Sequence, residues 1–172
     1  MRVRRLGLAA ALTLAVGGAA CADQPMDSEY TFPGSGLVGD PAQELIWMRC
    51  SLDQRYAEGR CHGEAGRFSW RAVQAQVDAL SSAECPWRLP RFHELRGLLQ
   101  PGASGGMAID SEAFPDTPEG WFWNQVSAGG HSQHDCFVDF TGEGRTRCNM
   151  GGDFYLRLVM PASAATPACT PQ

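Results

Sequence analysis

The chain has 172 residues and a formal charge of −5, from 14 arginines, no lysine and 19 acidic side chains. This length predicts one domain, and the acidic balance without any run of basic residues argues against nucleic acid as the main partner. The 20 glycines and 11 prolines indicate many turns and loops rather than a helical bundle.

The first 22 residues have the pattern of an export signal. Three arginines within the first five residues precede an apolar run over 6–16 that is too short to span a bilayer. Small residues follow, and Ala20-Cys21-Ala22 offers the spacing that a leader peptidase accepts. We therefore predict a signal peptide over 1–22 and an exported, periplasmic or secreted protein with no transmembrane segment after cleavage. The alternative is a lipid anchor on Cys21.

Cleavage would remove one of the seven cysteines and three arginines, which changes the formal charge from −5 to −8. An even number of cysteines in an exported chain predicts disulfides. Cys50 and Cys61 have ten residues between them, and Cys136 and Cys148 have eleven and flank a turn, so each pair is expected to close a local loop. Cys85 and Cys169 pair by elimination, although six cysteines allow fifteen connectivities.

The first half of the exported chain predicts one strand and two helices. Residues 23–36 are polar and broken by prolines and glycines, which is typical of a flexible lead-in. Leu45–Met48 is a short apolar run that predicts a buried strand. Apolar residues at helical spacing predict a helix over 69–80, with Ser69 as its N-cap. Leucines after Pro90 predict a second, shorter helix that ends before Pro101.

The second half predicts loops and short strands. A long loop is expected over 101–120, followed by an aromatic strand at Trp121–Trp123. Alternating residues from Cys136, a glycine-rich turn and a return strand to Cys148 predict a hairpin. A last strand is expected over 154–160, and the tail over 161–172 would be disordered unless Cys169 ties it down. The pattern predicts an α+β domain over 37–160, with antiparallel pairing.

The candidate binding residues lie between the aromatic strand and the last strand. Trp121 and Trp123 share one face of their strand; we expect at least one to be buried, and an exposed one could stack on a sugar or a protein. Arginine side chains in this region suit sulfate or carboxylate groups, although an ordinary polar loop is an equal alternative. The predicted ligand-binding set is Trp121, Trp123, Asn124, His131, His134, Arg145, Arg147 and Asn149.

Metal and catalytic motifs are weak. His131, His134 and Asp135 have spacing that could hold zinc, but a solvated loop is favoured because there is no fourth ligand in the cluster. The acidic residues at 110, 112, 116 and 119 are interpreted as a solvated stretch rather than a carboxylate pair. No catalytic triad or phosphate-binding loop occurs, so we predict no enzyme activity, metal or other cofactor.

A series of short motifs, taken in order, is similar to one family of bacterial exported proteins. The motifs are Leu45-Ile46-Trp47-Met48-Arg49-Cys50, Trp87-Arg88-Leu89-Pro90 with Glu94-Leu95, Ala108-Ile109-Asp110 with Ala113-Phe114-Pro115, the two tryptophans 121 and 123, Val138-Asp139-Phe140, and Tyr155-Leu156-Arg157-Leu158-Val159. Together they resemble the Lcl C-terminal domain family. That resemblance implies a disulfide-stapled, C-type-lectin-like fold with two helices packed on short strands. It also implies an exported or surface-displayed protein.

Some members of that family lie in adhesins that bind glycosaminoglycans or cell surfaces. The resemblance therefore implies a binding or adhesion module whose long loops recognise a glycan or an envelope protein. Calcium is not expected, because Asn124 is followed by Gln125 rather than by the aspartate of the sugar-binding lectin signature. Arg91 stands where a capping threonine or asparagine is usual, so the second helix should lose that hydrogen bond.

Two other functions compete with binding. The formylglycine-generating relatives of this fold use a redox-active or copper-binding cysteine pair, and only Cys136 and Cys148 could serve here. We favour structural disulfides over that enzyme class. The remaining alternative is a purely structural component of the cell envelope.

Overall fold

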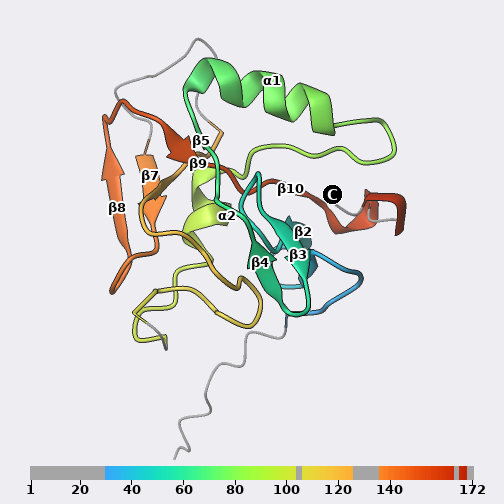
Figure 1. Ribbon diagram of the computed structural model, residues 1–172, viewed down its shortest axis with the longest axis horizontal. Coiled ribbons are helices and arrows are strands. Elements are labelled where there is room, and N and C mark those ends of the chain that lie inside the picture. The colour runs from blue at the N-terminus through green and yellow to red at the C-terminus, as the bar shows by residue number, and fades with distance from the viewer. Residues whose placement is uncertain (1–29, 104–105, 126–135, 165–166, 170–172) are drawn as a thin grey trace, which may run out of the picture.

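The computed structural model describes residues 30–103, 106–125, 136–164 and 167–169 (Figure 1). These residues form two α-helices, ten short strands and two 3₁₀ helices. The helices are α1 (Trp70–Leu80), α2 (Phe92–Arg96), η1 (Ala162–Ala164) and η2 (Pro167–Cys169). The strands are β1 (Leu37–Asp40), β2 (Leu45–Met48), β3 (Arg55–Ala57), β4 (Arg60–His62), β5 (Arg67–Phe68), β6 (Trp121–Phe122), β7 (Cys136–Asp139), β8 (Arg145–Cys148), β9 (Phe154–Tyr155) and β10 (Val159–Pro161).

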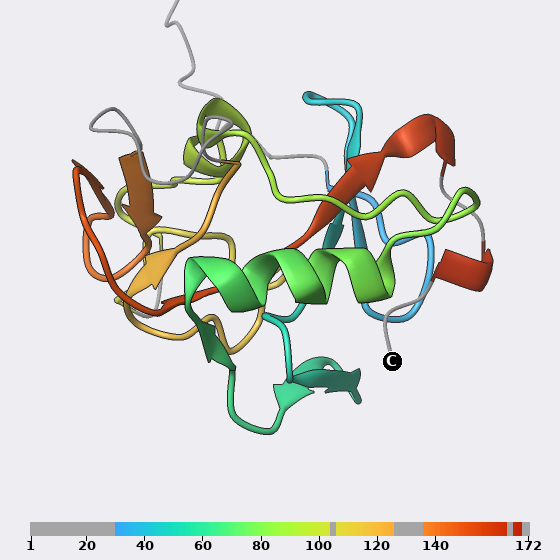
Figure 2. The same ribbon diagram turned by 90° about the horizontal axis from the view of Figure 1, so that it is seen from above.

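The strands form three small sheets. One has the order β1-β2-β10, the second is the β3–β4 hairpin, and the third has the order β5-β9-β6-β7-β8. The pairing is antiparallel except between β6 and β9, which run parallel. Figures 1 and 2 show β8 at one end of the molecule and the C-terminal 3₁₀ helices at the other, with α1 running between them. The predicted mixture of helices and antiparallel strands is therefore confirmed, with one parallel pair added. The C-type-lectin-like arrangement stays a prediction.

Helix α1 begins where the sequence indicates. The Ser69 side chain accepts a hydrogen bond from the Ala72 amide at 3.4 Å, which satisfies one of the free N–H groups of the first turn. Val73 is fully buried on the inner face of the helix. The predicted N-cap and apolar face of this helix are confirmed.

Helix α2 begins without a side-chain cap, as expected from Arg91. Glu94 provides the other half of the usual arrangement, because its carboxylate accepts a hydrogen bond from the Arg91 amide at 2.6 Å. The same carboxylate binds the Arg88 guanidinium through two contacts of 2.8 and 2.9 Å. Burial works against ionisation, yet these hydrogen bonds hold the pKa of Glu94 below its usual range.

The predicted strand over 154–160 is wrong as a single element, because the chain crosses there from one sheet to another. β9 belongs to the five-stranded sheet and β10 to the three-stranded sheet. Between them the carbonyls of Leu156 and Leu158 accept hydrogen bonds from Leu52 and Met48. Both leucines are fully buried, and the crossing links the two apolar clusters that form the core.

The ends of the domain are held by specific contacts. In the described part of the predicted lead-in, Thr31 pairs with Gly39 and the ring of Tyr30 packs edge-on against Phe114. At the other end Cys169 is bonded to Cys85. The export signal and residues 23–29 lie outside the described residues. Among the described residues, no helix is long and apolar enough to cross a membrane.

All three predicted disulfides are present: Cys50–Cys61, Cys85–Cys169 and Cys136–Cys148. The first is buried, whereas the third links two paired strands and leaves Cys148 exposed. The elimination that paired Cys85 with Cys169 is thereby confirmed.

Candidate functional site

The β7–β8 hairpin and the neighbouring strand β6 bring four predicted binding residues to one end of the molecule. β8 is an edge strand on which every residue is exposed, and its neighbour in the sheet, β7, is mostly buried. Arg145 lies opposite Asp139 and Arg147 lies opposite Phe137, so these four side chains share one face of the sheet. Trp121, the neighbour of Asp139 on β6, lies on the same face. Asn149 follows β8 and is exposed.

Asp139 and Arg145 form the charged centre of this surface. The side chain of Asp139 is 1% exposed and that of Arg145 is 64% exposed. The carboxylate accepts hydrogen bonds from the Thr141 amide at 2.9 Å and from the Thr141 hydroxyl, and it pairs with the Arg145 guanidinium. Although burial opposes ionisation, the bonds from Thr141 and Arg145 keep the pKa of Asp139 below its usual range. Asp139 is thus a buried anion that fixes Arg145.

Trp121 is partly covered by the same arginine. The Arg145 guanidinium carbon lies 5.6 Å from the centre of the Trp121 ring, within the range of a cation–π contact. The indole is half-buried, so only part of its surface faces solvent. Trp121 and Arg145 therefore form one unit held by Asp139.

Trp123 and Asn124 lie in the interior. The Trp123 ring is fully buried among Trp70, Phe137 and Phe154, and its N–H donates to the Phe68 carbonyl at 2.7 Å. Asn124 is 2% exposed and donates to the Cys136 carbonyl. Both side chains are therefore part of the packed interior. The expectation that at least one of the two tryptophans is buried is confirmed, and a ligand could reach Trp121 but not the buried face of Trp123.

His131 and His134 lie outside the described residues, as does Asp135. Within the ranges that are described, no group of three or more His, Cys, Asp and Glu side chains could hold a metal ion. The metal and cofactor expectations therefore stay predictions.

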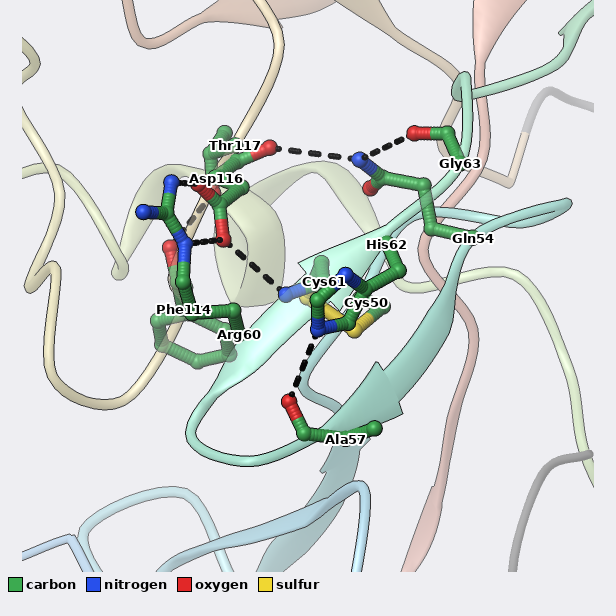
Figure 3. Close-up of polar contacts among 10 residues, drawn as sticks. All are labelled: Cys50, Gln54, Ala57, Arg60, Cys61, His62, Gly63, Phe114, Asp116 and Thr117. Atoms are coloured by element: carbon green, nitrogen blue, oxygen red, sulfur yellow. Dashed lines mark hydrogen bonds and ion pairs between the residues drawn. A yellow bond between two sulfur atoms is a disulfide. The ribbon is translucent and has the colours of Figure 1, made fainter.

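A second polar cluster, which the sequence did not indicate, surrounds Asp116. Figure 3 shows its carboxylate between the Arg60 guanidinium and the Cys61 amide, which donates at 2.9 Å. The hydrogen bond from Arg60 is the main reason that the pKa of Asp116 is lowered. The cluster ties the β3–β4 hairpin to the loop before β6. Sequence reasoning treated Asp116 as solvated, and no local signal joins two residues that lie 56 positions apart.

Two buried arginines were also missed as structural residues. Arg49 lies between the rings of Phe32 and Tyr56, at 4.6 and 4.3 Å, and its Nε donates to the Ala113 carbonyl at 3.1 Å. Arg157 is fully buried; it donates to the Thr117 hydroxyl at 2.9 Å and lies over the ring of Phe114. Burial lowers the pKa of Arg157 to about 9. Both positions fall in the family motifs, which was the available signal that they matter.

The carboxylates of these sites are paired within the protein. Each described carboxylate with a resolved downward pKa shift is paired with an arginine: Glu94, Asp116 and Asp139. Such carboxylates are poor general acids near neutral pH because they stay ionised, and they are weak general bases because their pKa is low. Arg147, in contrast, is exposed and forms no ion pair within the described residues.

The comparison with protein families gives one match. The model of the Lcl C-terminal domain matches residues 36–160, which is most of the chain and nearly all of its described part. No curated protein matches the chain, and no solved structure does either.

Proposed function

The chain belongs to the Lcl C-terminal domain family, and we propose that it is an exported binding or adhesion module that recognises acidic groups on a glycan or protein surface. The observation that carries this proposal is the surface formed by Trp121, Arg145 and Arg147 at the β8 end of the molecule. An arginine held by a buried carboxylate and an adjacent arginine with no ion-pair partner among the described residues suit carboxylate or sulfate ligands.

Export is supported by the three disulfides, which persist in oxidising compartments. It is also consistent with the leader pattern of the first 22 residues. We place the protein in the periplasm or outside the cell, either soluble or anchored through Cys21. The binding we propose requires no calcium, since Asn124 is 2% exposed and is followed by Gln125 rather than by the aspartate of the lectin signature.

We favour binding over catalysis because the ionised carboxylates already have arginine partners. The cysteines that an oxidase mechanism would use, Cys136 and Cys148, are joined in a disulfide across two strands. A structural role in the envelope remains the competing function, and it predicts no affinity for soluble acidic probes.

The test measures binding of the mature chain to heparin and to chondroitin sulfate, with neutral dextran as the uncharged control. We expect saturable binding that weakens as salt rises. Arg147→Gln should reduce affinity about tenfold, which corresponds to the loss of one charged contact. The matched control is Arg55→Gln, another exposed arginine, which lies on the separate β3–β4 sheet and should change affinity by less than about twofold.

The proposal is contradicted, and a structural role favoured, if the chain shows no saturable binding to heparin, to chondroitin sulfate or to a short acidic peptide. Equal losses in Arg147→Gln and Arg55→Gln would show that net charge, rather than the β8 surface, drives the association.

A further inference from the structure

Strand β8 has an outer edge that no described strand covers. It is the last strand of the five-stranded sheet and pairs only with β7 among the described elements. No backbone group of residues 145–148 forms a hydrogen bond outside that pair within the described part of the chain. All four residues are exposed, so amides and carbonyls along this edge are accessible to another chain.

The charge of this edge is basic in an acidic protein. Arg145 and Arg147 alternate along β8 and project on one face of the sheet. Asp139 compensates Arg145, whereas Arg147 has no acidic partner in the described residues. The chain as a whole carries a charge of −5, so Arg147 is a cation on an acidic protein.

Two possible occupants fit this edge poorly. A second copy of the chain, paired antiparallel through β8, would bring its own arginines against Arg145 and Arg147, and like charges across strands are destabilising. A sugar ring would need an open aromatic face, but Arg145 already lies over Trp121 and Trp123 is buried.

We propose that β8 receives an extended acidic polypeptide segment of a partner protein as an additional strand of the five-stranded sheet. Main-chain hydrogen bonds to the open edge supply affinity, and acidic side chains opposite Arg147 supply selectivity. This inference rests on the proposed function, since it names the partner class for the same surface.

The probe is a capped synthetic peptide of about eight residues that alternates glutamate and threonine. Its comparison peptide carries N-methyl groups on two adjacent central residues, which blocks both hydrogen-bonding edges without changing the charge. Binding is measured by fluorescence anisotropy, and amide hydrogen exchange is followed by NMR at residues 145–148.

We expect the parent peptide to bind and to slow exchange of the outward-facing β8 amides by at least about tenfold at saturation. The N-methylated peptide and the Arg147→Glu variant should each weaken binding by at least about tenfold, whereas Arg55→Glu should stay within about twofold of the parent. Arg147→Gln serves as a second variant if the charge reversal disturbs folding.

Equal binding of the two peptides, or unchanged exchange in β8, would overturn strand addition while leaving acidic-group recognition intact. Binding of heparin without binding of the peptide would also overturn strand addition and leave acidic-group recognition intact. If neither heparin, chondroitin sulfate nor the peptide binds, the proposed function fails together with this inference, and the arginines of β8 act only to protect the sheet edge from aggregation.

Discussion

Two hairpins of the molecule, β3–β4 and β7–β8, each take part in one disulfide and one arginine–aspartate ion pair, but they are held differently. In β3–β4 both contacts reach outside the hairpin: Cys61 bonds to Cys50, and Arg60 pairs with Asp116. In β7–β8 both contacts are internal: Cys136 bonds to Cys148, and Asp139 pairs with Arg145. The first hairpin is thus fastened to the body of the domain. The second is closed by contacts between its own strands, and no described strand pairs with its outer edge.

The largest difference between the hairpins is expected in the reduction of their disulfides. Cys50 and Cys61 are each 7% exposed, whereas Cys148 is exposed to solvent. Thiolate attack requires access, so dithiothreitol under native conditions should reduce Cys136–Cys148 at least about tenfold faster than Cys50–Cys61. Differential alkylation followed by peptide mass spectrometry measures both rates. Simultaneous reduction of the two bonds would show that the hairpins open together.

Removal of the disulfide of each hairpin should also lower the free energy of unfolding by different amounts. Closure of either loop is worth about 3 kcal/mol in the chain-entropy model, since the sequence separations are 11 and 12. Cys50→Ala with Cys61→Ala should cost about 1 kcal/mol more than Cys136→Ala with Cys148→Ala, because it also leaves a cavity in a buried site. Urea denaturation provides the comparison. An equal or smaller loss of stability on removal of Cys50–Cys61 would contradict the larger effect predicted for the buried disulfide.

Arg49 also holds the first hairpin to the body of the domain, because its guanidinium contacts the ring of Tyr56 on β3. Its replacement in Arg49→Gln removes the stacking between two rings and the hydrogen bond to the Ala113 carbonyl, so we expect a loss of about 2 kcal/mol in the free energy of unfolding. The exposed neighbour Arg55, changed to Gln, should stay within about 0.5 kcal/mol of the parent. Similar losses in both variants would remove the special role of Arg49.

In the second hairpin, Asp139 should make stability depend on acid pH. Its pKa is lowered on folding, so its ionised form contributes stability that is present above the unfolded pKa of about 3.9 and lost as the pH falls through the folded pKa. Asp139→Asn should therefore lose about 1 kcal/mol or more near neutral pH and less in acid. Chemical denaturation from pH 3 to 7 tests the trend; a constant difference across that range would contradict it.

The smallest expected effects come from the two exposed arginines of the ion pairs. The side chains of Arg60 and Arg145 are 70% and 64% exposed, but their partners Asp116 and Asp139 are 24% and 1% exposed. Arg60→Ala should cost less than about 1 kcal/mol, as surface pairs do. Arg145→Ala should cost more, because among the described residues it leaves only Thr141 as a donor to a buried carboxylate. Thermal unfolding at low and high salt measures both, and the reverse order would contradict the comparison.

Local patterns predicted the elements whose determinants lie close together in the chain. Ser69 and its apolar helix, the β7–β8 hairpin and the two short-range cysteine pairs follow from spacing within short segments. Contacts between distant segments could not be predicted in this way. The pairing of Arg60 with Asp116 and the parallel pairing of β6 with β9 depend on how the whole chain folds.

The candidate site was predicted only in part for the same reason. Alternation placed Trp121 and Trp123 on one face, but it could not tell which part of that face Phe137 and Phe154 would cover. The exposed arginines of β8 were identified from sequence, whereas the carboxylate that fixes Arg145 became evident only from the register of β7 and β8. Whether a side chain is buried depends on the assembled core, and sequence periodicity indicates only which face of its own helix or strand the side chain lies on.

The Cys85–Cys169 bond turns a large part of the chain into a covalent ring. The ring begins after α1, closes at η2 and contains α2 and all strands from β6 to β10. One proteolytic cut inside it, for example in the loop between α2 and β6, would open the ring without separating the chain into two molecules. The β8 surface would then remain attached to the rest of the protein after a cut that, in a chain without this bond, would release it.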